Sequence, residues 1–129
     1  MANSRIYVHE KIYDEFAKRF SASFAQFKHG DPLSKETTMG PQADDIQAKA
    51  VQSYLDIGNK EGKAILGGGK SDAGDKYVVA QSFLLLADLV YSFFNPTIFT
   101  DVSESSRINK EEVFGMLLAV RHLIRSNPG

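Results

Sequence analysis

The chain has 129 residues, of which 43% are hydrophobic and 24% charged, a composition typical of a single globular domain and too apolar for a disordered chain. Its 15 basic and 16 acidic side chains give a formal net charge of -1, so charge gives no reason to expect a nucleic acid or an anionic membrane as partner. It contains no cysteine, which excludes disulfides, zinc-thiolate sites and cysteine nucleophiles. The N-terminus lacks the apolar core of a signal peptide, and we expect a cytoplasmic location.

The first quarter of the chain predicts a strand followed by an amphipathic helix. Arg5-Ile6-Tyr7-Val8 is rich in strand-forming residues. Apolar residues then recur at helical spacing, which predicts a helix over residues 10–26 with this stripe in the core. The stripe consists of Ile12, Phe16, Phe20, Phe24 and Phe27, and Tyr13 and Ala17 widen it. His9 and His29 flank the helix without a second ligand nearby, and we interpret both as surface residues and not as metal ligands.

A second helix is predicted over residues 43–61, after a loop over residues 31–42. Two acidic residues in its first turn and Lys60 in its last suit the helix dipole, and Gly62 is a suitable stop. The predicted apolar face consists of Ile46, Ala50, Tyr54 and Ile57, with Val51 and Leu55 beside it. A short strand over residues 63–66 follows.

The glycine-rich loop Gly67-Gly68-Gly69-Lys70 partly matches a phosphate-binding loop. Gly69-Lys70-Ser71 ends like a GxxxxGKS motif, but Ala64 stands where the first glycine is required. No helix start follows the loop, and a phosphate cradle needs backbone amides that lead into a helix N-terminus. The sequence therefore favours a simple turn.

Residues 78–94 form an unusually apolar stretch, VVAQSFLLLADLVYSFF. One interpretation is a buried or partner-seeking helix. A second is a membrane span, which needs roughly twenty apolar residues and is opposed by Gln81 and Asp88. A third is translated non-coding sequence from an unspliced message.

The segment Glu111-Glu112-Val113-Phe114-Gly115 is the candidate site. If it is extended, Glu112 and Phe114 project to the same side. A carboxylate there can accept two hydrogen bonds from the hydroxyls of a ribose, and a phenyl ring offers an apolar face to a flat heterocycle. The alternative is an acidic helix start, with Phe114 simply buried.

Several motifs, in order, resemble the aldehyde dehydrogenase family. Glu111 to Gly115 resembles its EE-(I/V)-FGP motif, although Met116 stands where the family has proline. Pro96-Thr97-Ile98-Phe99-Thr100-Asp101-Val102 resembles its PT(I/V)(F/L)xDV run. Gly30-Asp31-Pro32-Leu33 and Met39-Gly40-Pro41 resemble a GDPxxxxTxxGP loop, and Ser4-Arg5-Ile6-Tyr7-Val8-His9 resembles the strand after the catalytic cysteine. The matches cover residues 2–77 and 94–120 and correspond to a slice of a catalytic domain. Relative to the family pattern that the chain resembles, about fifteen residues are inserted at 80–93.

The resemblance implies NAD(P)-dependent oxidation of an aldehyde to a carboxylic acid as the family's activity. It implies that Glu112 holds the nicotinamide ribose and that Phe114 contacts the nicotinamide side. The family's cysteine nucleophile would lie one position before Met1, and its general-base motif and cofactor domain are not found in the sequence. We therefore assign no catalytic residue and no metal ligand, and predict that the chain is inactive alone.

The fold class expected is α/β, an incomplete parallel-sheet domain with flanking helices over residues 1–129, interrupted by the apolar insert at 78–94. Exposed strand edges and the insert predict self-association. The partners expected are a second copy of the chain or a full-length aldehyde dehydrogenase on which it docks as a non-catalytic protein. Membrane association is a minor alternative.

NAD or NADP is the cofactor that the resemblance implies. One hydrogen-bonding carboxylate contributes only about 1.5–3 kcal/mol, whereas micromolar affinity requires about 8 kcal/mol. We therefore expect no useful binding of NAD by this chain alone.

Overall fold

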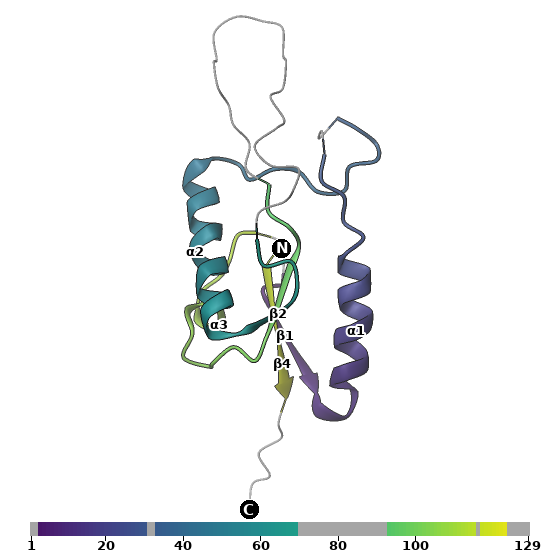
Figure 1. The fold of residues 1–129 in the computed structure, drawn as a ribbon, viewed down its shortest axis with the longest axis vertical. Helices are drawn as coiled ribbons and strands as arrows, with labels where there is room; N and C mark the ends of the chain where they lie inside the picture. Colours follow the sequence, from purple (N-terminus) through teal and green to yellow (C-terminus); the bar gives the residue numbers. More distant parts are fainter. Residues whose placement is uncertain (1–2, 31–32, 70–92, 116, 124–129) are drawn as a thin grey trace, which may run out of the picture.

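A computed structural model describes residues 3–30, 33–69, 93–115 and 117–123 of the chain. In this part of the chain a four-stranded sheet lies between two long helices (Figure 1). The strands are β1 (Arg5–His9), β2 (Lys63–Leu66), β3 (Thr97–Thr100) and β4 (Leu117–Leu123). The helices are the 3-10 helix η1 (Glu10–Ile12), α1 (Tyr13–Phe24), α2 (Asp45–Glu61) and the short α3 (Arg107–Lys110).

The sheet has the strand order β1-β4-β3-β2 and is mostly parallel. Strand β4 pairs in parallel with β1 and with β3, so that Ile6 lies beside Val120 and Phe99 beside Ala119. Strand β2 runs antiparallel to β3. The inner strand β3 is buried along its whole length, as expected of a sheet covered on both faces. The predicted α/β fold class is confirmed.

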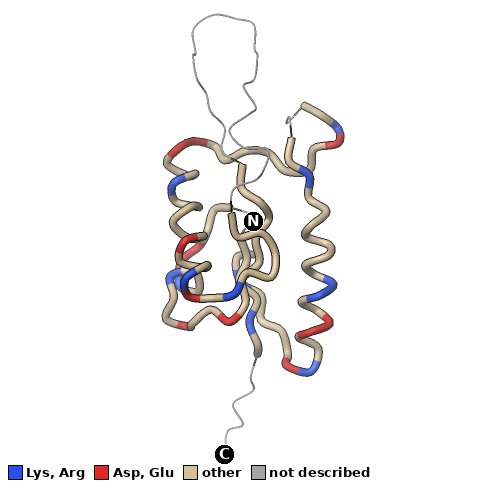
Figure 2. The backbone as a smooth tube through the Cα atoms, viewed as in Figure 1, with Lys and Arg blue, Asp and Glu red and all other residues tan. Residues whose placement is uncertain are grey.

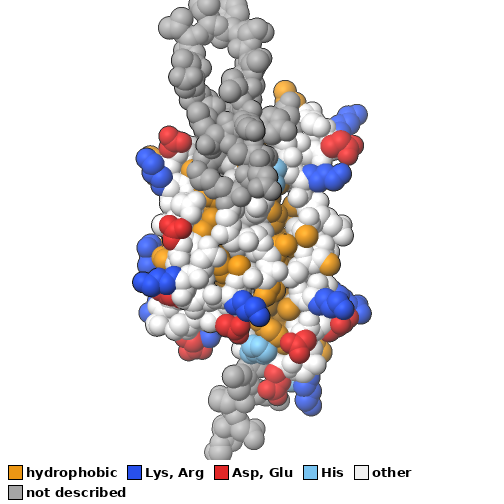
Figure 3. All heavy atoms as spheres, in the orientation of Figure 1, with side chains coloured by type: hydrophobic (Ala, Val, Ile, Leu, Met, Phe, Trp, Pro, Cys, Tyr) orange, Lys and Arg blue, Asp and Glu red, His pale blue; other side chains and the backbone are white. Residues whose placement is uncertain are grey.

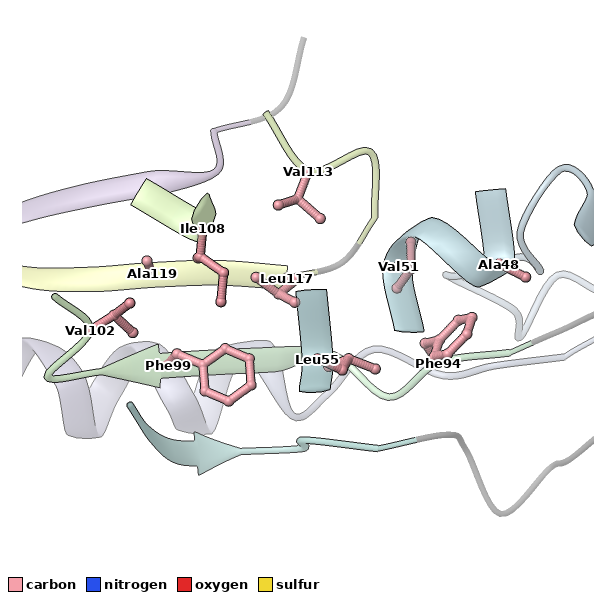
Figure 4. Packing of buried hydrophobic residues seen from close by; sticks show 10 residues of the cluster. All are labelled: Ala48, Val51, Leu55, Phe94, Phe99, Val102, Ile108, Val113, Leu117 and Ala119. Carbon is pink, nitrogen blue, oxygen red and sulfur yellow. The ribbon is translucent and has the colours of Figure 1, made fainter. Parts of the chain in front are cut away.

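The two faces of the sheet form two hydrophobic cores, because successive side chains of a strand point in opposite directions. Phe99 of β3 points toward α2, and its neighbour Ile98 belongs to the core beneath α1. Figure 4 shows the core on the α2 side; it contains Ala48, Val51, Leu55, Phe94, Phe99, Val102, Ile108, Val113, Leu117 and Ala119. The core on the α1 side contains Val8, Tyr13, Phe24, Ile98, Leu118 and Val120.

Helix α2 ends at Glu61 as predicted and begins at Asp45, two residues later than predicted, but it buries a different face. The Asp44 carboxylate accepts a hydrogen bond from the backbone N–H of Gln47 at 2.7 Å, and Gly62 follows the last residue. The buried residues are Ala48, Val51, Leu55 and Gly58. Ile46, predicted on the apolar face, is 81% exposed. That prediction was wrong because close approach to the sheet brings the small residues inward and turns Ile46 to the solvent.

Helix α1 is shorter than predicted, and the two ends of its apolar stripe lie outside it. The 3-10 turn of η1 precedes it, and the helix ends at Phe24. A 3-10 turn has 3.0 residues per turn and changes the phase of the stripe. Consequently Ile12 is 58% exposed, while Tyr13 takes the buried position. Phe27, beyond the helix end, is 38% exposed. The rest of the predicted stripe, Tyr13, Phe16, Ala17, Phe20 and Phe24, packs in the core on the α1 side.

The two histidines that flank α1 differ in environment. His9 is exposed as predicted, and its Nδ1 accepts a hydrogen bond from the backbone N–H of Lys11 at 3.2 Å. The surface prediction for His29 was wrong, because its ring is half-buried and packs edge-on against Phe93, with the ring centroids 5.8 Å apart. This burial lowers the pKa of His29. No group of three or more acidic or histidine side chains in the described ranges is arranged to hold a metal ion.

The glycine-rich loop is a turn that packs against β3. Gly67 and Gly68 have positive φ angles of 69° and 95°, which glycine adopts without steric cost. The backbone N–H of Gly68 donates a hydrogen bond to Thr97 Oγ1 at 3.0 Å.

Of the apolar stretch at 78–94, residues 78–92 lie outside the described residues, whereas Phe93 and Phe94 are buried. No described helix has the length and apolar character needed to cross a membrane.

The surface mixes both signs of charge. Figure 2 shows lysine and arginine interspersed with aspartate and glutamate along both long helices, consistent with the formal net charge of -1. Figure 3 shows a strip of apolar side chains between α1 and the strands on the visible face. Partly buried side chains that pack against the core on the α1 side include Phe16 and Phe20 of α1 and Ile65 and Leu66 of β2.

Candidate functional site

The segment Glu112–Gly115 links α3 to β4 and alternates between exposed and buried residues. Val113 is 5% exposed and belongs to the core on the α2 side, whereas Glu112 and Phe114 are both exposed, Phe114 by 69%. The backbone is extended at Glu111, and the chain then turns at Phe114, where the N–H of Gly115 donates to the carbonyl oxygen of Val113. The alternative of an acidic helix start with a buried Phe114 is wrong, because helix α3 ends at Lys110 and the backbone of Glu111 is already extended.

One face of helix α2 holds this segment in place. Gln47, Val51 and Tyr54 recur at spacings of four and three, which places them on the same face of a helix. Gln47 Nε2 donates a hydrogen bond to the carbonyl oxygen of Phe114 at 2.6 Å, and the Tyr54 hydroxyl donates one to Glu111 Oε2 at 2.6 Å.

Between these two hydrogen bonds, Gly115 lies close to Val51. A Cβ atom at Gly115 would come within 2.9 Å of Val51 Cγ2, so the backbone passes directly over the helix surface. The N–H of Gly115 also donates to the carbonyl oxygen of Val113 at 3.0 Å, which makes the turn tight. The segment is therefore tied to α2 just before its start, at Glu111, and at its end, at Phe114 and Gly115.

The residue before the segment, Glu111, is the centre of a polar network. Arg107 donates to both of its carboxylate oxygens, from Nε to Oε1 at 3.0 Å and from Nη2 to Oε2 at 2.8 Å. Hydrogen bonds from Arg107 and then from Tyr54 lower the pKa of Glu111 to about 2. The hydrogen bond to Glu111 raises the pKa of Tyr54 in turn, and the Arg107 guanidinium lies over the Tyr54 ring, 5.2 Å from its centroid.

The short helix α3 is anchored to the neighbouring elements by Arg5 and Asn109. Arg5 Nη1 donates to the carbonyl oxygen of Asn109 at 2.9 Å, which ties α3 to strand β1. The Asn109 side chain donates to the carbonyl oxygens of Val102 at 3.1 Å and Ser103 at 2.6 Å, which closes the loop after β3. Sheet and helix α2 therefore fix the start of the segment from two directions.

Sequence reasoning singled out Glu112 and Phe114 but none of the residues that hold them. In the structure both side chains are exposed, and they precede and follow the buried Val113 in the sequence. Gln47, Arg107 and Asn109 were not considered for any role. The apolar face predicted for α2 included Tyr54, with Val51 beside it, but not Gln47. The helical spacing of these three residues was a signal that could have placed them on one face.

Comparison with known proteins gives a consistent result. Residues 1–123 match the sequence model of the family described as aldehyde dehydrogenase. An aldehyde dehydrogenase of Alternaria alternata is 36% identical over 119 residues, which cover 92% of this chain and 21% of that protein. A 1-pyrroline-5-carboxylate dehydrogenase of Bacillus licheniformis is also 36% identical, over 92% of this chain and 20% of its own length.

Solved structures show the same similarity. The aldehyde dehydrogenase of Bacillus cereus in its NAD+ complex superposes with a TM-score of 0.76 and 30% identity, covering 95% of this chain and 22% of that one. The aldehyde dehydrogenase KauB of Pseudomonas aeruginosa superposes with a TM-score of 0.75 and 29% identity, covering 93% of this chain and 22% of that one. The chain therefore spans about a fifth of the length of the relatives that it matches.

Proposed function

Because this chain belongs to the aldehyde dehydrogenase family, we propose that it is the part of a catalytic domain that contributes one wall of the nicotinamide cofactor site. Glu112 accepts hydrogen bonds from the nicotinamide ribose, and Phe114 contacts the nicotinamide side. The observation that carries this proposal is the exposure of both side chains around a buried Val113, on a segment held by α2. The activity served is the oxidation of an aldehyde with NAD or NADP.

The chemistry of the two side chains suits these roles. An ionised carboxylate has two acceptor oxygens and can take one hydrogen bond from each hydroxyl of a vicinal diol. The Phe114 ring is 69% exposed, so a flat heterocycle can pack on it without any rearrangement of the core. When bound, the cofactor supplies the hydride acceptor. The residues of this chain bind and orient it, and none of them is assigned a role in the chemical step.

The proposal is tested in a chimaera, in which residues 1–123 replace the matching stretch of the Bacillus cereus enzyme. The variant Glu112→Gln keeps one acceptor but loses the charge, and we expect the KM for NAD to rise about tenfold, near the lower limit for a charged hydrogen bond. Phe114→Ala removes the ring and is expected to weaken NAD binding as well. Initial rates at varied NAD concentration measure both effects, and NADH fluorescence titration measures binding without turnover.

The matched control is Glu61→Gln, which makes the same chemical change at an exposed carboxylate at the end of α2. We expect this variant to bind NAD as the unmodified chimaera does. If Glu112→Gln and Glu61→Gln give the same KM and the same NADH affinity, Glu112 is not a cofactor contact and the proposal is wrong.

A second candidate function, docking on a full-length aldehyde dehydrogenase as a non-catalytic protein, is supported by the outer strands. Within the described sheet, β1 and β2 each pair with a single strand, and an outer strand presents backbone groups that can pair with another chain. We expect the tagged chain to co-purify with an intact family member expressed in the same cells. Ala64→Lys places a charge on an exposed position of β2 and is expected to reduce recovery. Equal recovery with an unrelated bait would reject this function.

A further inference from the structure

We propose that Tyr54, Arg107 and Glu111 are positioning residues, which fix the direction in which Glu112 and Phe114 leave the core. This inference rests on the proposed function, because it names what holds the two cofactor contacts. We refer to the three side chains and their hydrogen bonds as the Glu111 network. It joins three elements, since Tyr54 lies on α2, Arg107 begins α3, and Glu111 is the first residue after α3.

The network acts at the point where the chain changes direction. Helix α3 has a single turn, from Arg107 to Lys110, and the N–H of Glu111 still donates to the carbonyl oxygen of Arg107 at 2.8 Å. The side chains of the same two residues pair across this turn. Glu111 is thereby held by its backbone and its carboxylate, and Glu112 follows it directly.

The second end of the segment is held by the same helix. Gln47 holds the carbonyl oxygen of Phe114, two turns of α2 before Tyr54 holds Glu111. Glu112 and Phe114 therefore project from a segment whose ends are both tied to one rigid face. A carboxylate that is to meet two hydroxyls must be oriented as well as present, and such orientation is the usual task of supporting hydrogen bonds.

The network is too exposed to be explained as a support of the whole fold. The side chains of Arg107 and Glu111 are 56% and 44% exposed, and ion pairs at the surface contribute little to global stability. The fold is held instead by the core, in which Ile108 and Val113 are buried on either side of the network. Loss of the network is therefore expected to loosen the segment and to leave the sheet intact.

The test uses the full 129-residue chain labelled with 15N. In Tyr54→Phe and Glu111→Gln we expect amide hydrogen exchange at position 111 and at Gly115, whose N–H groups donate to the carbonyl oxygens of Arg107 and Val113, to become about two- to fivefold faster, the range that follows from surface ion pairs. Exchange at Leu55 and Phe99 in the core should not change. The matched control is Glu15→Gln, which breaks an exposed pair with Arg19 at the same spacing of four residues on α1.

The pH dependence separates positioning from a general effect of mutation. The groups that face Glu111 are the Arg107 guanidinium of α3 and the Tyr54 hydroxyl of α2. Because the folded-state pKa is lowered from 4.5 to about 2, the network is complete above pH 4.5 and is lost as the pH falls toward 2. The ratio of exchange rates between Tyr54→Phe and the unmodified chain should be constant above pH 4.5 and should fall toward one below it.

Unchanged exchange at position 111 and at Gly115 in both variants would overturn the inference. It would also be overturned by equal acceleration at Leu55 and Phe99, because the network would then support the whole fold. The same substitutions in the chimaera should raise the KM for NAD and leave kcat unchanged. Exchange at the segment decides the positioning role, whereas the KM of Glu112→Gln decides the proposed function, so failure of one is distinguished from failure of the other.

Discussion

Replacement of Phe99 by alanine is expected to lower the free energy of unfolding by about 3–5 kcal/mol. Phe99 is fully buried in β3, at the centre of the core on the α2 side (Figure 4). The substitution removes the whole ring and leaves a cavity between the sheet and α2, which the rigid strand and helix can only partly close. Since small domains are stable by only about 5–15 kcal/mol, a large share of the stability is lost.

Urea denaturation followed by circular dichroism, at low micromolar protein concentration, measures this effect. The control is Ile46→Ala, which truncates a residue of α2 that is 81% exposed and is expected to change the free energy of unfolding by no more than about 0.5 kcal/mol. If the two substitutions proved equally mild, Phe99 would not be the centre of a packed core, and the arrangement of α2 on the sheet would be wrong.

The second large effect is expected at Gly58, where alanine should destabilise the chain although it is the better helix former. In an exposed helix the change from glycine to alanine stabilises by about 1 kcal/mol. Here a Cβ atom would come within 2.3 Å of the Phe99 ring. Overpacking of a core costs about 1–3 kcal/mol, and we expect a value near the upper limit, because the ring cannot move without displacing β3. The steric cost therefore exceeds the gain in helix propensity.

The steric origin of this effect is tested by a double-mutant cycle. Phe99→Leu shortens the side chain that opposes Gly58, so Gly58→Ala should cost less in its presence than in the unmodified chain. The matched control is Gly40→Ala, since a Cβ atom at Gly40 meets nothing within 4 Å. Additive effects of Gly58→Ala and Phe99→Leu would mean that the two residues do not touch.

The functional segment illustrates how far sequence reasoning reached. Local chemistry and motif order identified Glu112 and Phe114 as candidates, because a carboxylate and a ring two residues apart suit a ribose and a heterocycle. The same reasoning left an acidic helix start as an alternative, which was rejected by the end of α3 at Lys110 and by the exposure of Phe114. The supporting residues Gln47 and Tyr54 lie 67 and 57 positions from their partners. Contacts over such separations leave no trace in a local pattern.

The sequence by itself determined the class of fold, the ends of α2 and the family. The Asp44 carboxylate caps the first turn of α2 by chemistry that is local to the sequence. Gly62 marks the other end, and in the structure it also lies close to Val102 and Thr100. The tertiary structure alone decided which stripe of α2 is buried and what holds Glu112 in place. The physical reason is that helical periodicity fixes only the spacing of a face, whereas its direction depends on the packing of helix against sheet. Here Gly58 lies against the Phe99 ring, and Ile46 is exposed.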